Sequence, residues 1–431
     1  MKLFSAFIFS AILALNLSGQ QVQKSIFGTF ALTNGTLHTV ENGTFLGTII
    51  IKDGSIAELG SNVSIPSGAV EIDCTGKHIY PGFIDSGCRL GLAEIESISL
   101  SNDFDELGDF IPHMRALTAV NPNSVSIPVT RVNGVTTVFA KPQGGLFPGM
   151  GALINLHGYT ADQMYAGAEG VILQFPSLGR KGRFDKRSPE EIKKDNEKAL
   201  KKLNDIWENA TTFAQMDSLS KTLNKSMNDY NPQMKALLPV IQGKTQCFIE
   251  VNSKEDILSA IQWVEKWKIK AVFMGVAEGW RVADEIAKAK IPVITGPVLA
   301  VPGREIDRYD VAYSNVSKLL KAGVKVAIRT NDAENVRNLP FNAGFAATYG
   351  AGVDAALRAI TLTPAEIFGV SDTYGSLKKG KIGNIFVSDG DPFEPKTKIL
   401  HLFIKGWKIP LESRQTLLND EFLQRDPGLE K

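Results

Sequence analysis

The feature that most constrains the fold is a long alternation of strand-like and helix-like segments in the middle of this 431-residue chain. Short runs rich in β-branched residues recur between helical stretches, at 135–139, 171–173, 248–251, 271–273, 293–294 and 324–328. Such alternation over about 300 residues is typical of a parallel sheet, and its length suits an α/β fold of the (β/α)8 TIM-barrel type. A doubly wound sheet is the alternative, although no G-x-G-x-x-G sequence follows a strand.

Both ends of the chain have a different pattern, in which short β-rich runs are separated by turn signals. Near the amino end, Asn34-Gly35, Asn42-Gly43 and Asp53-Gly54 indicate hairpin turns. Similar runs return near the carboxyl end, at 383–387 and 402–406. Neither end alone has enough strands for a stable sheet, so we predict one small β-sandwich built from both chain ends. The predicted division is 20–80 with 376–431 for this composite domain and 81–375 for the barrel.

One segment, 181–225, departs from the barrel pattern because it is dense in charge. Ser188-Pro189-Glu190-Glu191 has the spacing of a capping box with proline at the first helical position, which predicts a helix over 190–216. We interpret the segment as a helical insertion with a solvated charged face. A surface for a partner protein is the alternative.

Charge, cysteine content and the amino terminus limit the classes of function. Lys+Arg 47 against Asp+Glu 46 gives a net charge of +1, which argues against nucleic acid as a partner. Cys74, Cys88 and Cys247 have the spacing of neither a disulfide framework nor a zinc motif. Lys2 precedes an apolar run to Leu17, which predicts a signal peptide over 1–19. We expect a secreted protein without a membrane span, periplasmic in a Gram-negative cell.

Several motifs occur in order along the barrel segment. They read GKHIYPGFIDS at 76–86, GVTTV at 134–138, IPVITGP at 291–297, TPAEIFG at 363–369 and GSLKKGK at 375–381. Together they resemble the amidohydrolase superfamily and its imidazolonepropionase-like branch. The resemblance implies hydrolysis of non-peptide C–N bonds, often in cyclic amides, by a metal-bound hydroxide. It also implies metal ligands at the carboxyl ends of strands: an HxH pair on the first, a carboxylated Lys or a Glu on the fourth, histidines on the fifth and sixth and an Asp on the eighth.

The chain departs from this pattern at the implied metal-ligand positions. The HxH positions hold Gly87 and Arg89, the fifth-strand and sixth-strand positions fall near Glu250 and Met274, and the eighth holds Asn331. The histidines all lie elsewhere, at His38, His78, His113, His157 and His401. Loss of a metal-bound hydroxide removes about 12 kcal/mol of nucleophile activation, and a carboxylate base recovers only about 3–5 kcal/mol. We therefore expect a metal-depleted pseudoenzyme with no cofactor that binds a small-molecule ligand or a partner.

Two hypotheses concern the residues that replace the metal. Arg89 and Arg329 are expected to approach each other above the barrel, with a counter-ion from Glu94, Glu250 or Asp332. In the first hypothesis Arg89, Arg329 and Asn331 bind the ligand, with Arg89 in the former metal volume; a purely structural ion pair there is the other interpretation. In the second hypothesis the protein is an active hydrolase. Glu250 and Asp332 then act as acid and base or hold a single zinc-like divalent metal. A homo-oligomer or a heteromer with an active paralogue is also expected.

Overall fold

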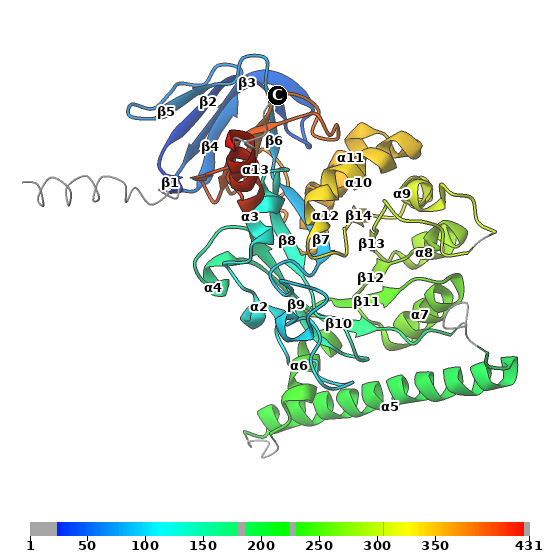
Figure 1. Ribbon diagram of the computed structural model, residues 1–431. Coiled ribbons are helices and arrows are strands. Elements are labelled where there is room, and N and C mark those ends of the chain that lie inside the picture. Colours follow the sequence, from blue (N-terminus) through cyan, green and yellow to red (C-terminus); the bar gives the residue numbers. More distant parts are fainter. Residues whose placement is uncertain (1–23, 179–185, 225–229, 305, 426–431) are drawn as a thin grey trace, which may run out of the picture.

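Two sheets organise the molecule. The computed structural model describes residues 24–178, 186–224, 230–304 and 306–425, so the predicted signal peptide at 1–19 lies outside the described residues. A nine-stranded sheet lies at one end of the molecule, and an eight-stranded barrel sheet with flanking helices lies beside it (Figure 1). The α/β barrel with a separate sheet from both chain ends, as predicted from the sequence, is therefore confirmed.

The barrel sheet runs in the order β14-β13-β12-β11-β10-β9-β8-β7. Neighbouring strands are parallel except at β9, which is antiparallel to both β8 and β10. Backbone bonds after β7 and β14 bring the sheet close to closure, since Asn331 N donates to Gly87 O (3.0 Å) and Arg89 N donates to Asp332 O (2.8 Å). Every residue of β7 and β8 is buried, as expected for strands covered on both faces. The strands are β7 (Phe83–Cys88), β8 (Val135–Ala140), β9 (Gly149–Asn155), β10 (Tyr165–Gln174), β11 (Cys247–Val251), β12 (Ala271–Gly275), β13 (Val293–Thr295) and β14 (Val326–Ile328).

The composite sheet joins the two ends of the chain. Its order is β1-β17-β16-β15-β6-β2-β3-β4, with β5 paired to β2. The antiparallel pair β6–β15 makes the junction, with Tyr80 opposite Phe386. The strands are β1 (Ile26–Phe27), β2 (Phe30–His38), β3 (Thr44–Lys52), β4 (Ser55–Gly60), β5 (Val70–Asp73), β6 (His78–Pro81), β15 (Ile385–Ser388), β16 (Ile399–Ile404) and β17 (Trp407–Ile409).

One of the three predicted hairpin turns is wrong. Asn42-Gly43 and Asp53-Gly54 do lie between consecutive strands, but Asn34-Gly35 lies inside β2. There Asn34 has a positive φ of 58° and the register against β3 shifts between Leu32 and Gly35. The dipeptide therefore forms a bulge, which uses the same left-handed backbone as a tight turn without reversing the chain.

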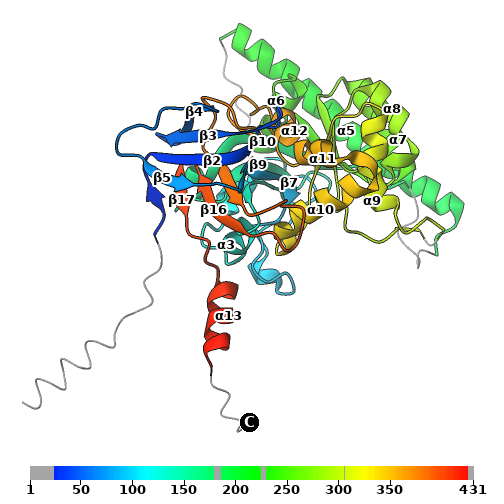
Figure 2. The same ribbon diagram turned by 90° about the horizontal axis from the view of Figure 1, so that it is seen from above.

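Helices connect and cover the barrel strands. They are α2 (Ala116–Ala119), α3 (Ser126–Arg131), α4 (Ala161–Met164), α5 (Pro189–Thr222), α6 (Pro232–Ile241), α7 (Lys254–Trp267), α8 (Ala283–Ala289), α9 (Val311–Lys321), α10 (Leu339–Ala346), α11 (Val353–Ala359), α12 (Leu362–Ile367) and α13 (Arg414–Gln424). Short helical turns occur at η1 (Ser99–Ser101), η2 (Gly279–Arg281), η3 (Asn335–Asn338) and η4 (Ala347–Ala351). No helix in the described part of the chain is long and apolar enough to cross a membrane. Helix α13 buries none of its residues and projects from the body (Figure 2).

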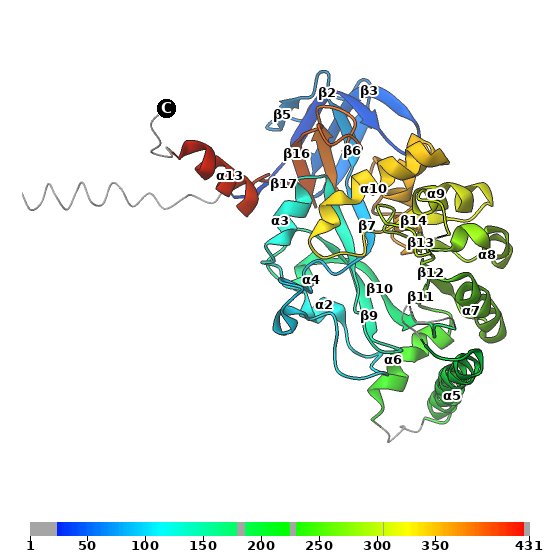
Figure 3. The same cartoon turned by 45° about the vertical axis from the view of Figure 1, so that its right-hand side comes forward.

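The charged insertion forms α5, which lies at the end of the barrel far from the composite sheet (Figure 3). Its predicted capping box is confirmed: Glu191 N donates to Ser188 Oγ (3.2 Å), and Ser188 N donates to the Glu191 carboxylate (2.7 Å). The helix continues past the predicted end to Thr222. Leu203, Trp207 and Ala210 are its buried residues, so packing supports only the middle of a largely solvated helix.

Replacing Ser188 by alanine is expected to destabilise the start of α5 by about 1 kcal/mol, because the backbone N–H of Glu191 loses its acceptor. Hydrogen exchange of the first-turn amides should become faster in this variant. Ser218→Ala is the matched control, since Ser218 is exposed in the same helix and makes no cap. Equal exchange in the two variants would contradict a stabilising role for the cap.

Candidate functional site

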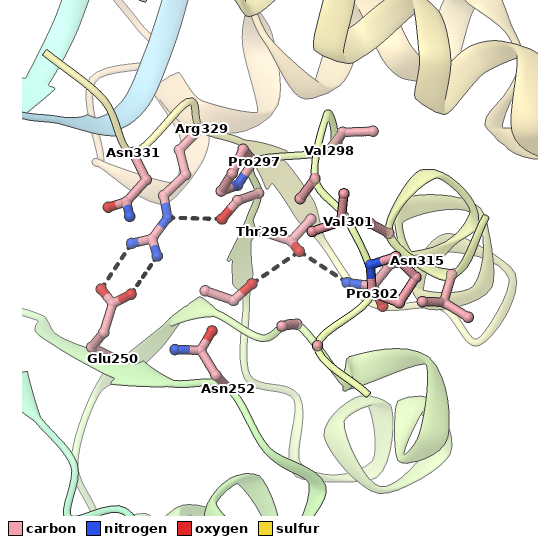
Figure 4. A pocket seen from close by; sticks show the side chains of 17 residues that line it. Glu250, Asn252, Thr295, Pro297, Val298, Val301, Pro302, Asn315, Arg329 and Asn331 are labelled. Atoms are coloured by element: carbon pink, nitrogen blue, oxygen red, sulfur yellow. Dashed lines mark hydrogen bonds and ion pairs between the residues drawn. The ribbon is translucent and has the colours of Figure 1, made fainter. Parts of the chain in front are cut away.

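A pocket of about 200 Å³ lies at the carboxyl ends of β11 to β14. In a barrel of this kind, functional side chains gather at this end because the loops that follow the strands meet there. Figure 4 shows the charged pair Arg329 and Glu250 on one side, with apolar residues on the other. The lining includes Glu250, Asn252, Thr295, Gly296, Pro297, Val298, Val311, Asn315, Arg329 and Asn331.

The centre of the site is an ion cluster. The Arg329 guanidinium, whose side chain is only 2% exposed, donates through both Nη1 and Nη2 to the Glu250 carboxylate, with Nη1–Oε2 at 2.8 Å. Its Nε donates to Gly296 O at 3.4 Å (Figure 4). The Lys141 ammonium lies 3.6 Å from Glu250 Oε2 and its side chain is also 2% exposed. Two basic side chains therefore share one carboxylate, in a bidentate geometry that suits arginine.

The cluster controls the protonation of its members. Burial alone would raise the pKa of Glu250, but the Arg329 and Lys141 cations lower it to about 2. Burial lowers the pKa of Lys141, and Glu250 partly opposes this effect. Glu250 is therefore ionised at neutral pH and is held in place by its two partners.

Lys141 is a central residue that sequence reasoning missed. It directly follows β8, at the carboxyl end of an apolar strand run. A charged residue in that position of a barrel strand is itself a signal for the mouth of the barrel. The resemblance does not point to it, because the metal ligands that it implies lie on the first, fourth, fifth, sixth and eighth strands, and Lys141 follows the second.

The predicted counter-ion of Arg89 is wrong. Arg89 donates to Glu96, with Nη2–Oε1 at 2.6 Å, instead of pairing with a predicted acid. Its Nη1 also donates to Gln143 Oε1 (3.3 Å) and Asn331 O (3.2 Å). The acids predicted as partners have other contacts: Glu94 accepts from Asn121 and Ser124, Glu250 from Arg329, and Asp332 from Asn335.

The structure does not combine Glu250 and Asp332 into one pair. Asp332 Oδ1 accepts from the backbone N–H groups of Glu334 and Asn335, both at 2.9 Å, and so caps the turn that leads into η3. It is absent from the pocket lining, whereas its neighbour Asn331 lines the pocket with a left-handed backbone (φ 55°). Of the residues predicted from the sequence, Glu250, Arg329 and Asn331 therefore meet at one pocket.

A second buried carboxyl group, that of Asp85, links β7 to the segment that follows β14. Thr330 donates to Asp85 Oδ2 through its backbone N (3.1 Å) and its Oγ1 (2.5 Å), and Gly87 N donates to Oδ1 (2.9 Å). Burial raises the pKa of Asp85 to about 7 despite these bonds. Asp85 does not line the pocket, so its contacts place it as a brace between β7 and the segment after β14.

Two pocket-lining residues each have a buried oxygen that makes no hydrogen bond to the described residues. Asn315 Nδ2 donates to Val276 O (2.9 Å) and Thr295 Oγ1 (3.0 Å), which leaves its buried Oδ1 without a partner. The Oδ1 atom of Asn331 is buried and without a hydrogen bond as well. A buried polar atom without a partner is costly, so these two oxygens are local weak points in the packing around the pocket.

Comparison with known proteins agrees with this architecture. A profile of the amidohydrolase family matches residues 304–409, which include β14 and the arginine of the ion cluster. In this segment the chain is similar to the amidohydrolase family. An amidohydrolase from Thermotoga maritima MSB8 has the same fold, with a TM-score of 0.79 and 24% identity over 88% of this chain and 99% of that one.

Two further matches are more distant. Molinate hydrolase aligns with a TM-score of 0.54 and 15% identity, over 89% of this chain and 95% of its own. The amidohydrolase tasK of Hapsidospora irregularis is 20% identical over 391 residues. That match covers 84% of this chain but only 40% of the relative, so this chain spans about two fifths of the length of tasK.

The divalent metal implied by the superfamily does not fit the residues at the mouth of this barrel. A Cβ added at Gly87 would lie 2.8 Å from the methyl group of Met274 and 3.1 Å from Arg329 Cδ, so a histidine there would require both side chains to move. Lys141 and Arg329 place two basic groups around the Glu250 carboxylate. Within residues 24–178, 186–224, 230–304 and 306–425, no three His, Cys, Asp or Glu side chains are arranged to hold a metal ion.

Proposed function

We propose that this protein is an exported, metal-depleted amidohydrolase relative that binds a small cyclic amide without hydrolysing it. The observation that supports this most directly is the buried ion cluster of Arg329, Glu250 and Lys141 at the centre of the barrel mouth. A dication next to two basic side chains would be repelled by both. Arginine keeps its charge at all accessible pH values, so this repulsion does not disappear on titration.

The ligand class follows from the chemistry of the pocket wall. A cyclic amide presents a C=O and an N–H side by side on one edge. Asn331 and Asn252 both line the pocket, and each side-chain amide can both donate and accept a hydrogen bond, as a cyclic amide can. The opposite wall of Pro297, Val298 and Val311 suits the apolar part of a small ring.

The competing proposal, an active hydrolase with Glu250 as general base, has weaker support. A general base works best when its pKa lies near the working pH. The pKa of Glu250 is lowered to about 2, which makes the carboxylate a poor proton acceptor at neutral pH. Asp332, the other predicted participant, accepts backbone N–H bonds in its own turn.

Metal analysis and a binding assay test the proposal together. The full chain, purified without chelator, is expected to contain far less than one zinc, manganese or iron ion per chain, and EDTA is expected to leave its Tm unchanged. Hydantoin, used as the cyclic amide probe, should raise the Tm and remain intact by chromatography. Asn331→Gly should weaken hydantoin binding about tenfold, because it removes a hydrogen-bonding side chain while keeping the positive φ.

Asn419→Ala is the control, since Asn419 is exposed on α13 and far from the pocket lining. Near-stoichiometric metal together with hydantoin hydrolysis would overturn the proposal in favour of an active hydrolase. Failure of hydantoin to change the Tm would overturn the assigned ligand class. The export part rests on the sequence of residues 1–19, and amino-terminal sequencing of secreted protein tests it.

A further inference from the structure

A second pocket, of about 220 Å³, lies away from the barrel mouth. It is lined by Asn123, Ser124, Arg131 of α3, Leu156, His157 and Met164 of α4, among others. His157 follows β9, and Leu156 N donates to Thr136 O near the start of β8. Since β9 is antiparallel to β8, this pocket lies at the end of the barrel opposite the ion cluster.

Among the described residues, the guanidinium of Arg131 has no acidic partner. Its Nη1 donates to Leu156 O (3.1 Å), and its Nε is buried without a hydrogen bond. No carboxylate among the described residues forms an ion pair with it, and burial lowers its pKa to about 10. By contrast, the buried Arg329 has a bidentate carboxylate. A guanidinium removed from water without a counter-ion is unfavourable, which makes this pocket electrostatically incomplete.

Other basic groups surround the same space. His157 lines the pocket, and its pKa is lowered to about 4 by burial and by the nearby cations Arg131 and Lys405. Lys405 comes from the turn between β16 and β17, and its Nζ donates to Gln163 O (3.2 Å). Arg131 lines the pocket and Lys405 lies near His157, so two cations favour an anion there, while the uncharged His157 ring can supply a hydrogen bond.

We propose that this pocket binds a small phosphate-class oxyanion, held by the Arg131 guanidinium with the His157 ring beside it. Phosphate suits the site better than a carboxylate because it carries more negative charge and accepts hydrogen bonds in several directions. Arginine recognises phosphate bidentately, and four of the five N–H donors of Arg131 have no hydrogen-bond partner within the described protein. The volume exceeds that of several waters and admits a phosphate with a small organic group.

Calorimetry in phosphate-free buffer tests this site on the full chain. Inorganic phosphate and glycerol 3-phosphate are titrated to about 10 mM, about tenfold above a millimolar Kd. Binding of either supports the proposal, and their relative affinities distinguish free phosphate from a phosphate ester as the source. Acetate is expected to bind at least about tenfold more weakly than the better of the two.

Arg131→Met is expected to weaken phosphate binding at least about tenfold, because a charge-assisted hydrogen-bond donor is lost. Its Tm without phosphate should match or exceed that of the wild type, since the substitution removes an unpaired charge, and this separates lost binding from misfolding. Lys202→Gln, on α5 in a different pocket, is the charge-matched control and should bind phosphate normally. Absence of binding in the wild type, equal affinity for acetate, or unchanged binding by Arg131→Met would each overturn the proposal.

Discussion

Replacing Glu250 by glutamine is expected to lower the free energy of unfolding at pH 7 by about 3–5 kcal/mol. The substitution keeps the shape of the side chain but removes the only carboxylate that Arg329 and Lys141 share. Both basic side chains are 2% exposed, so water does not replace the lost partner. Urea unfolding of wild type and variant measures the difference.

The same variant should change how the free energy of unfolding depends on pH below pH 4.5. Because the folded-state pKa of Glu250 is lowered from 4.5 to about 2, its ionisation stabilises the fold above pH 4.5. That contribution is lost as the pH falls from 4.5 towards 2. Glu250→Gln cannot bind the proton, so the gap in stability between wild type and variant should narrow over this range.

A surface ion pair provides the control for Glu250→Gln. Asp205 pairs with Lys201 four residues earlier in α5, and both side chains are more than half exposed. Asp205→Asn is expected to change the free energy of unfolding by less than about 0.5 kcal/mol. If Glu250→Gln changed the free energy of unfolding as little as Asp205→Asn, the buried cluster would not stabilise the fold.

Gly296→Ala is also expected to lower the free energy of unfolding strongly, by about 2–5 kcal/mol. Gly296 has a φ of 125°, a backbone conformation that residues with a Cβ rarely adopt. An added Cβ would also overlap the backbone carbonyl oxygen of Arg329, and backbone cannot rotate away as a side chain does. Because Gly296 O accepts from Arg329 Nε, the strain reaches the ion cluster directly.

Gly303 offers a matched comparison on the rim of the same pocket. A Cβ there meets nothing within 4 Å, and its φ lies outside the left-handed region. Gly303→Ala is expected to stay within about 0.5 kcal/mol of the wild type. Thermal unfolding of the two variants side by side measures the contrast, and similar Tm values would argue against the described path of the chain at Gly296.

Much of the fold is encoded in local patterns of the sequence. The barrel strands are predictable because their apolar β-branched runs are buried on both faces, as β8 shows. The capping box at Ser188 marks the start of α5 within the first turn. The antiparallel β9 lacks such a signal, because strand direction depends on which neighbours pair and not on composition. Asn34-Gly35 was misleading for a related reason, since bulges and turns share left-handed backbone.

The site was predicted in part. Counting barrel strands placed Glu250 and Arg329 at the correct ends, because the carboxyl end of each strand is visible in the sequence. Counting strands could not predict which acidic side chain pairs with which arginine. Arg89 pairs with Glu96 and Arg329 with Glu250, a choice that depends on side-chain direction and loop path. Lys141 joined the cluster from a strand that the family pattern does not emphasise.

The junction of β6 with β15 has a consequence for how the protein is made. Pro81 and Ile385 are register partners about 300 residues apart, so a nascent chain cannot complete the composite sheet until nearly all of it has been synthesised. Long-range strand pairing of this kind is slow to form. The composite sheet therefore reaches its final form only after β15 to β17, its last strands in the sequence, have been synthesised.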